Sequence, residues 1–269
     1  MSDISGFGSR DEAKEFIERH RLFFDRFPNL KEALRVAFVR EFATEANADK
    51  VVFYSGRLAV EDFNEMLVLS GNGYGAGALK LLRGMFERLV TAHYVHTHPT
   101  EADNFLDYFW VSQQKVLQVI KENFGADVLN KDLVEEVDTN YRRVKDKFMI
   151  PHCDECPKIR LNHNWTRMDI VSMAKVDGMF GKYLVDAYYV PLREAHSTAA
   201  AILSRLDIVE DTVTFEFRPQ RKLADAALIT SHRLLLLNLV LQQQHFKLED
   251  LEQALARCGR DFEEIWPKG

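Results

Sequence analysis

The sequence predicts an all-α fold, a single multi-helix bundle around a buried central helix at about residues 77–97. The chain has 269 residues, of which 46% are hydrophobic, and this is enough apolar side chain for a sizeable core. The stretch 71–99 is apolar on most sides of a helix, as in the central helix of a bundle. Strand-like alternation is convincing only at 211–217 (DTVTFEF), so we expect at most one short extended hairpin there.

Before the central helix, the pattern predicts a short tail and three helical segments. Residues 1–10 have no apolar periodicity and are expected to be a disordered tail. Ser9 is a suitable N-cap for a first helix, which Pro28 is expected to end. Further helices are expected at 30–46 and 57–69.

After the central helix, amphipathic patterns predict further helices. Pro191 is expected to kink or restart one of them, because proline lacks the amide hydrogen that a helix interior needs. Residues 149–166 contain prolines and asparagines and are expected to be irregular. No repeat or long linker divides the chain, so we interpret residues 11–266 as a single helical domain. The helices are expected at 101–124, 127–148, 167–176, 182–206, 221–244 and 248–266.

The central helix carries three polar side chains within its apolar surface. Arg83 and Glu87 are four residues apart, so they share a helix face and can form an ion pair. His93 falls among apolar positions of the same helix. Two interpretations remain open. Either these side chains are satisfied members of the core, or they belong to a polar site of the kind that facing helices build in a bundle.

Four glycines precede this helix, at positions 71, 73, 75 and 77. Their composition is that of a phosphate-binding loop, but such loops follow a strand and this one follows a helical pattern. The motif G-x-x-x-x-G-K-[ST] is also missing from the sequence. The pattern therefore favours a helix–helix turn in which two backbones approach closely.

The net charge of −6 does not indicate a broad nucleic-acid-binding surface. The first residues lack the apolar centre of a signal sequence, and the run Leu234–Leu241 is interrupted by Asn238 and is too short to span a membrane. We therefore expect a cytoplasmic protein without membrane contact. The same run could belong to the core or to the face of a homodimer, and periodicity does not decide between them.

The segment HCDEC at 152–156 holds Cys153 and Cys156 in the C-x-x-C spacing of half a zinc site. His163 is a candidate third ligand. A second C-x-x-C pair is missing, and the alternative is a pair of reduced thiols in a loop. Zinc at these three residues is therefore one of two interpretations, and no other cofactor is expected.

A further group of candidates lies at 183–197. Tyr189, Arg193 and His196 are candidates for ligand binding or acid–base chemistry, because histidine titrates near neutral pH. Arg193 and His196 share a face of the expected helix by their spacing. Ser197 does not form a nucleophile–base pair with His196, since neighbours on a helix diverge by about 100°. A hydrogen-bonded core histidine is the alternative role of His196.

The order of these motifs resembles an uncharacterised all-helical bacterial family known only as a domain of unknown function. The shared features are ALKLLRGMFE at Ala78–Glu87, an Asn-Trp-Thr loop at 164–166 and a Tyr-rich segment that ends at His196. The resemblance covers about residues 57–246 and implies a helical fold without an established activity. It also marks a shared polar cluster, which consists of Arg83, Glu87, Trp165 and His196.

A looser similarity is to the helical ribonuclease toxins of abortive-infection systems, which carry an Arg and, a few residues later, a His. Arg88 and His93 have this spacing. The chain departs from the pattern at Leu89, where a polar residue is usual, and Arg88 and His93 face different sides of the helix. The similarity implies that His93 or His196 would accept the proton of a ribose 2′-OH while an Arg stabilises the phosphate charge.

Three classes of function follow from these patterns, and the sequence leaves open whether the chain is an enzyme. The first is a bacterial stress or phage-defence protein that works through Arg83, Glu87 and His196. The second is a non-catalytic interaction or scaffold module in which the same residues stabilise the core. The third is a metal-independent ribonuclease-like toxin. An enzyme requires the three side chains to line an accessible cleft, whereas an interaction module requires them to be sealed.

Overall fold

The structure is a computed structural model, and it describes residues 10–152, 158–176, 178–196, 198–209, 212–215 and 219–267. Helices dominate this part of the chain, and its strands form only two short antiparallel pairs. The predicted all-α class is therefore confirmed. The helices are α1 (Arg10–Arg19), α2 (Arg21–Phe38), α3 (Asn47–Gly71), α4 (Gly75–Thr97), α5 (Ala102–Phe124), α6 (Lys131–Val144), α7 (Ile170–Lys175), α8 (Val190–Ala195), α9 (Ala199–Leu203), α10 (Arg221–Phe246) and α11 (Glu249–Ile265).

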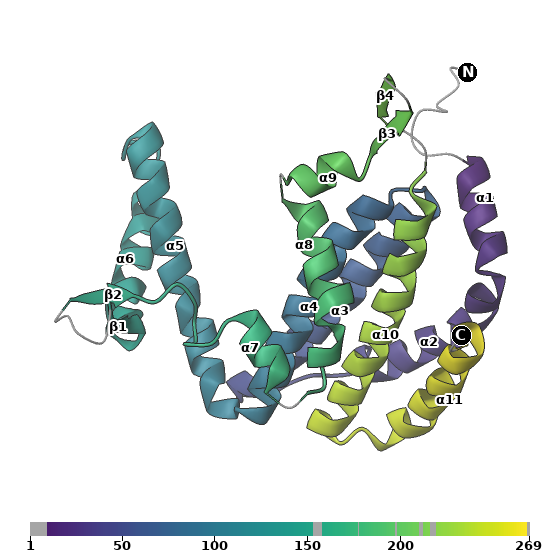
Figure 1. Cartoon of the computed structure of the whole chain (residues 1–269). Helices are drawn as coiled ribbons and strands as arrows, with labels where there is room; N and C mark the ends of the chain where they lie inside the picture. Colours follow the sequence, from purple (N-terminus) through teal and green to yellow (C-terminus); the bar gives the residue numbers. More distant parts are fainter. Residues whose placement is uncertain are drawn as a thin grey trace, which may run out of the picture.

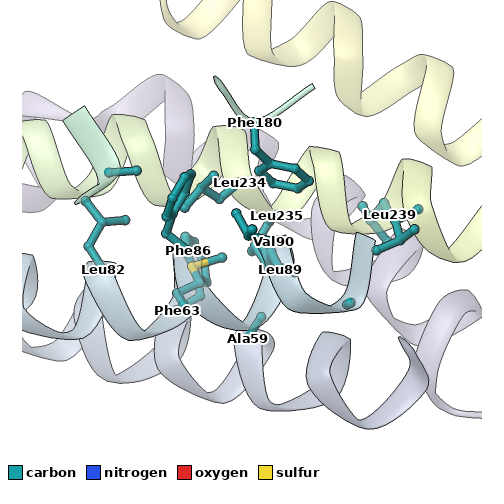
Figure 2. Packing of buried hydrophobic residues seen from close by; sticks show 14 of the residues in the cluster. Ala59, Phe63, Leu82, Phe86, Leu89, Val90, Phe180, Leu234, Leu235 and Leu239 are labelled. Carbon is teal, nitrogen blue, oxygen red and sulfur yellow. The ribbon is translucent and has the colours of Figure 1, made fainter. Parts of the chain in front are cut away.

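Three long helices, α3, α4 and α10, pack side by side and form the centre of the fold (Figure 1). Leu82, Phe86 and Leu89 of α4 are fully buried. In Figure 2, Phe86 and Leu89 lie between Phe63 of α3 and Leu234 of α10. α7 and α8 contact α4 as well. The expected central helix is thus confirmed as α4.

By length and composition alone, α10 is apolar enough to cross a membrane, a property that core helices of soluble proteins share. Half of its most apolar window is buried inside the structure. Leu234, Leu235, Leu239 and Leu241 are fully buried in the shared core. The run that the sequence left open between core and dimer face therefore belongs to the core.

Two polar side chains of α10 lie inside this core. Asn238 Nδ2 donates to the carbonyl oxygen of Gly56 at 2.9 Å, and Gln242 Nε2 donates to that of Val52 at 3.1 Å. Gly56 makes room for both side chains. A Cβ at Gly56 would lie 2.5 Å from Gln242 Nε2 and 2.7 Å from Asn238 Oδ1. These bonds fix the register of α3 against α10, because a slip of either helix would leave buried amides unpaired.

The glycine-rich turn between α3 and α4 packs on the start of α10. Gly73 has a φ of +78°, which glycine adopts without strain. A Cβ at Gly75 would lie 2.5 Å from the carbonyl oxygen of Gln220 and 2.5 Å from the amide nitrogen of Ala224. The Gln220 side chain accepts a hydrogen bond from the Ala76 amide at 2.9 Å. The close approach of two backbones that the sequence predicts is therefore confirmed.

α5 and α6 pack against each other and project from the bundle as an arm (Figure 1). Val111, Val144 and Phe148 form a small apolar cluster of their own between them. Beside the arm, β1 (Met149–Pro151) pairs antiparallel with β2 (Ile159–Leu161). This hairpin lies in a segment that the sequence predicts to be irregular. Strands of three residues are too short for period-two alternation to be visible.

The long helix expected at 182–206 is divided into shorter elements. A π-helical turn, Val185–Tyr189, precedes α8. Pro191 lies in the first turn of α8, where the amide hydrogen that it lacks would have no intrahelical partner. The predicted restart at Pro191 is therefore confirmed.

Beyond Ala195 the predicted helix is wrong. His196 has an extended backbone, and the Thr198 side chain caps the separate helix α9 by accepting from the Ala201 amide at 3.1 Å. A hydroxyl next to free amides favours a new helix start over continuation of the old one. After α9, β3 (Leu206–Val209) pairs antiparallel with β4 (Thr212–Phe215), which places the expected hairpin at this point.

Candidate functional site: a cationic side chain between a carboxylate and an imidazole

The site begins with two side chains one turn apart on α4. Arg83 Nε donates to Glu87 Oε1 at 2.8 Å, so the predicted ion pair is confirmed. The Arg83 side chain is 22% exposed and the Glu87 side chain 35% exposed. Neither is sealed in the core, so a ligand in solution can reach both.

His196 joins this pair from the end of α8. Arg83 Nη1 lies 2.8 Å from His196 Nε2. A guanidinium has only donors, so the imidazole accepts the bond at Nε2 and carries its proton on Nδ1. Arg83 is thereby held between an anionic carboxylate and a neutral imidazole. The structure brings together Arg83, Glu87 and His196, three of the four residues that the resemblance marks as a polar cluster, but not the fourth, Trp165.

An aromatic ring completes the cluster. The guanidinium carbon of Arg83 lies 5.0 Å from the centre of the Tyr188 ring, in the range of a cation–π contact. Tyr188 comes from the π-helical turn, an irregularity that is frequent at functional sites. Tyr189, the tyrosine selected from the sequence, is exposed and meets Tyr188 edge-on at 5.3 Å. The Tyr-rich composition was the available signal, but it did not show which tyrosine faces Arg83.

A pocket of about 580 Å³ opens next to Glu87, between α3, α4, α5 and the loop after β2. Its volume lies in the range of small-molecule sites. Gly84, which has no side chain, and Thr91 line the pocket from α4. The apolar lining is Val51, Tyr54, Leu58, Phe105, Leu106 and Ile170, and the polar lining includes Lys50, Ser55, Glu87, Arg88 and Asn164. Glu87 both lines the pocket and bonds to Arg83, so it connects the pocket to the cluster, whose other members do not line the pocket.

Arg88, which lines the pocket, donates from its Nη1 to Asp62 Oδ2 at 2.7 Å. Burial raises the pKa of Asp62 to about 6, although the charge of Arg88 acts in the opposite direction. A carboxyl group that titrates near neutral pH beside a cleft is typical of functional sites. Asp62 was not among the residues predicted from the sequence. Its position between buried Ala59 and Phe63 on α3 was the available signal.

His93 and Arg88, the pair with the toxin-like spacing, contact different neighbours. His93 is buried, and its ring centre lies 5.4 Å from that of Phe180. Arg88 lines the pocket on the side of α3. Among the contacts of the described residues, Arg83 is joined to a histidine, whereas the bond of Arg88 goes to Asp62.

Trp165 and Arg193, the other candidates for binding, lie outside the cluster. Trp165 is buried, and its ring meets those of Tyr94 and Phe105 at 5.8 and 5.3 Å, so it packs between α4 and α5. Arg193 is exposed on α8, and its Nε donates to Glu194 Oε1 at 3.3 Å. Arg193 lines another pocket, which lies at the start of α10.

The zinc prediction stays untested. Cys153 and Cys156 lie outside the described residues, and His163 is exposed. Within the described ranges, no three His, Cys, Asp or Glu side chains are placed to hold a metal ion.

The sequence matches the "Family of unknown function (DUF5677)" over residues 49–214, which is more than half of the chain, so the chain belongs to this family. The expected membership in a family of unknown function is therefore confirmed. The matched span includes Arg83, Glu87 and His196 and ends before α10. No curated protein sequence and no solved structure matches the chain.

Proposed function

We propose that this chain is a metal-independent ribonuclease-like enzyme whose site is formed by Arg83, Glu87 and His196. The observation that carries the proposal is the neutral ring of His196 held against the guanidinium of Arg83 at 2.8 Å. A neutral imidazole can act as a general base, and a guanidinium is well suited to bind a phosphate. Solvent access to the cluster supports this class over a sealed core.

The chemistry follows from competition for Arg83. Non-bridging oxygens of a phosphodiester bind the Arg83 fork in place of His196, whose Nε2 then accepts the proton of the ribose 2′-OH. The 2′-oxygen bonds to phosphorus, the bond to the 5′-oxygen breaks, and that oxygen takes a proton from water. The hydroxide that remains takes the proton from His196, which returns the imidazole to its neutral form. The products are a 2′,3′-cyclic phosphate and a 5′-hydroxyl. Arg83 stabilises the negative charge that develops on the non-bridging phosphate oxygens, an effect worth about 10²- to 10³-fold in rate.

The neighbouring pocket gives the substrate a place to bind. Tyr54 and Phe105 offer aromatic rings for an unstacked base, and Lys50 and Arg88 offer positive charge. Unpaired bases of single-stranded RNA stack on aromatic side chains in this way. The positive charge that this proposed site offers to RNA comes from this pocket and the neighbouring cluster. A small site of this kind is consistent with a chain whose net charge is −6. As the sequence resemblance implies, we place the activity in the bacterial cytoplasm, in stress response or phage defence.

The test combines growth and RNA cleavage. Wild type, Arg83→Ala and His196→Ala are expressed from an inducible promoter, with Arg21→Ala as a control because its side chain is 84% exposed and lies on α2. Purified proteins are then incubated with single-stranded RNA in EDTA. We expect growth arrest and 2′,3′-cyclic products from wild type and the control only. Uncleaved RNA with wild type, or equal cleavage by folded cluster variants, would refute the proposal.

A second candidate function is a non-catalytic interaction module. The observation that favours it is the exposed apolar surface of the arm, where Phe109, Val116, Val119 and Phe124 are each more than half exposed. The partner we consider is a second copy of the chain. Light scattering on wild type and Val116→Glu distinguishes the outcomes. A dimer that the substitution dissociates supports the module, whereas a monomeric wild type removes this candidate.

Zinc binding by Cys153 and Cys156 remains a separate proposal, based on their spacing alone. Metal analysis of protein purified without chelator tests it. Protein that contains no zinc would end this proposal and leave the ribonuclease proposal unchanged.

A further inference from the structure

A second pocket, of about 420 Å³, lies where α8, the turn after α9 and the start of α10 meet. Its lining is rich in basic side chains, whereas the net charge of the whole chain is −6. One acidic residue, Glu194, contributes to the lining. The basic residues of the lining are Arg193, Arg205, Arg221 and Lys222.

Glu194 holds two of these basic side chains in place. It is only 4% exposed. Arg193 Nε donates to its Oε1 at 3.3 Å, and Arg205 Nη2 lies 3.6 Å from its Oε2. One buried carboxylate thus faces two guanidinium groups. The charge is not balanced, and each arginine keeps unused donors of its fork for a ligand.

Arg221 is held from the other side by α1. Its guanidinium donates to both carboxylate oxygens of Glu12, at 3.0 and 2.7 Å, and it also pairs with Glu15. These acids do not line the pocket. Lys222 is exposed and has no ion pair or hydrogen bond within the described residues. Arg193, Arg205 and Lys222 therefore supply most of the uncompensated charge.

The start of α10 adds to the positive electrostatic potential of the pocket. Its first turn contains no acidic residue and has two basic ones, which is opposite to the usual preference at the positive end of a helix. The first intrahelical bond is made by the Ala224 amide, so the amides of Lys222 and Leu223 precede it. Gln220 does not cap them with its side chain, which bonds to the Ala76 amide instead. A basic residue at this position is unfavourable for the helix unless an anion offsets its charge. Glu12 and Glu15 offset Arg221, whereas Lys222 has no such partner within the described residues.

We infer that this pocket binds a phosphate ester of nucleotide size. Arginine forks bind phosphate oxygens in pairs, and the free amides at the N-terminal end of a helix donate hydrogen bonds to the same group. Ser204 and Gln220 provide polar contacts, and Pro219 and Leu223 provide an apolar surface for the organic part. The volume suits a single nucleotide unit. The same chemistry is offered by a free nucleotide and by one unit of an RNA chain, and these two sources are distinguished below.

The experiment is calorimetric titration of the full chain with three probes: inorganic pyrophosphate, ATP and a short single-stranded RNA. Lys222→Glu is the main variant, because Lys222 holds no partner in the fold and its substitution leaves internal ion pairs intact. Lys31→Glu, an exposed lysine on α2, is the matched control. We expect Lys222→Glu to weaken binding by at least about tenfold, the effect of one charge-assisted contact. The control should bind as wild type does.

Glu194→Gln tests the inference in the opposite direction. It removes the acidic charge from the lining and keeps a side chain of the same shape, so phosphate binding should become tighter. A general loss of structure cannot produce that result. RNA that binds about tenfold more tightly than ATP identifies the RNA chain as the source, and the reverse order identifies a free nucleotide. Wild type that binds none of the probes, or a Lys222→Glu variant that binds like wild type, overturns the inference. Titrations in a His196→Ala background keep this outcome separate from the ribonuclease proposal.

Discussion

Arg83 Nη1 and His196 Nε2 lie 2.8 Å apart, although 113 positions separate the two residues along the chain. This bond connects the centre of α4 to the end of α8. It also determines the chemistry of the imidazole, because a group that only donates selects the tautomer with a lone pair on Nε2. In this tautomer the lone pair of His196 lies on Nε2, the atom that faces Arg83.

The tautomer of His196 can be measured directly. Long-range ¹H–¹⁵N spectra of protein with labelled histidine should show His196 protonated at Nδ1 at pH 8. In Arg83→Ala the donor is lost, and the ring should shift toward the Nε2-protonated form that free histidine prefers. Tyr188→Phe, which keeps the ring over the guanidinium, is the control and should leave the tautomer unchanged. An Nε2-protonated ring in wild type would contradict the arrangement.

Local patterns predicted the central part of the fold well. The apolar surface that includes Leu82, Phe86 and Leu89 indicated a helix buried on most sides, and this periodicity does not depend on what the helix packs against. The Arg83–Glu87 pair was equally predictable, since both members lie on one helix. Gly73 and Gly75 indicated close backbone contact from composition alone.

Tertiary contacts explain the features of the fold that were predicted wrongly or missed. Pro28 was expected to end the first helix, but α2 continues through it. The break lies instead at His20, whose Nε2 is 2.8 Å from Asp225 Oδ1 on α10. A contact across 205 positions is invisible to a local pattern. The pocket and Asp62 were missed for the same reason, because both exist only where α3, α4 and α5 meet.

Gly56→Ala should destabilise the protein by about 1 to 3 kcal/mol, as overpacking of a filled core does. The new methyl group would overlap the side-chain nitrogen Nε2 of Gln242 and the side-chain oxygen Oδ1 of Asn238, and both residues are buried. Gly259→Ala is the matched control, since a Cβ there meets nothing within 4 Å. In the interior of α11 it should stabilise by about 0.5 to 1 kcal/mol. Urea unfolding of both variants checks these opposite signs, and equal effects would show that Gly56 is not needed for close packing.

Asp62→Asn should reveal the raised pKa of Asp62 as a pH dependence of stability. With a pKa of about 6 in the fold and 3.8 as its ordinary value, the carboxyl binds its proton more strongly when folded. The stability that this proton binding adds to the fold is therefore complete below pH 3.8, and it is lost as the pH rises through 6. The asparagine variant does not lose it, so its free energy of unfolding relative to wild type should increase by about 1 to 3 kcal/mol from pH 4 to pH 7. A difference that stays constant over this range would show that Asp62 ionises normally.

His232 should produce a pH dependence of the opposite sign. It is buried near Phe23 and Phe262, and burial lowers its pKa to about 4 from 6.5. The unfolded chain then binds a proton that the fold excludes, so stability is complete above pH 6.5 and is lost as pH falls toward 4. The expected loss is about 1 to 3 kcal/mol.

His232→Gln is the variant that separates this effect from packing. The ring nitrogen Nδ1 accepts a hydrogen bond from Trp266 Nε1 at 3.1 Å, and a glutamine oxygen can accept in its place without titrating. The stability of wild type relative to this variant should therefore decrease as pH is lowered from 7 to 4.5. The measurement is urea unfolding at four pH values. Parallel curves for the two proteins would mean that His232 becomes protonated inside the fold, and that water reaches the interface between α2, α10 and α11.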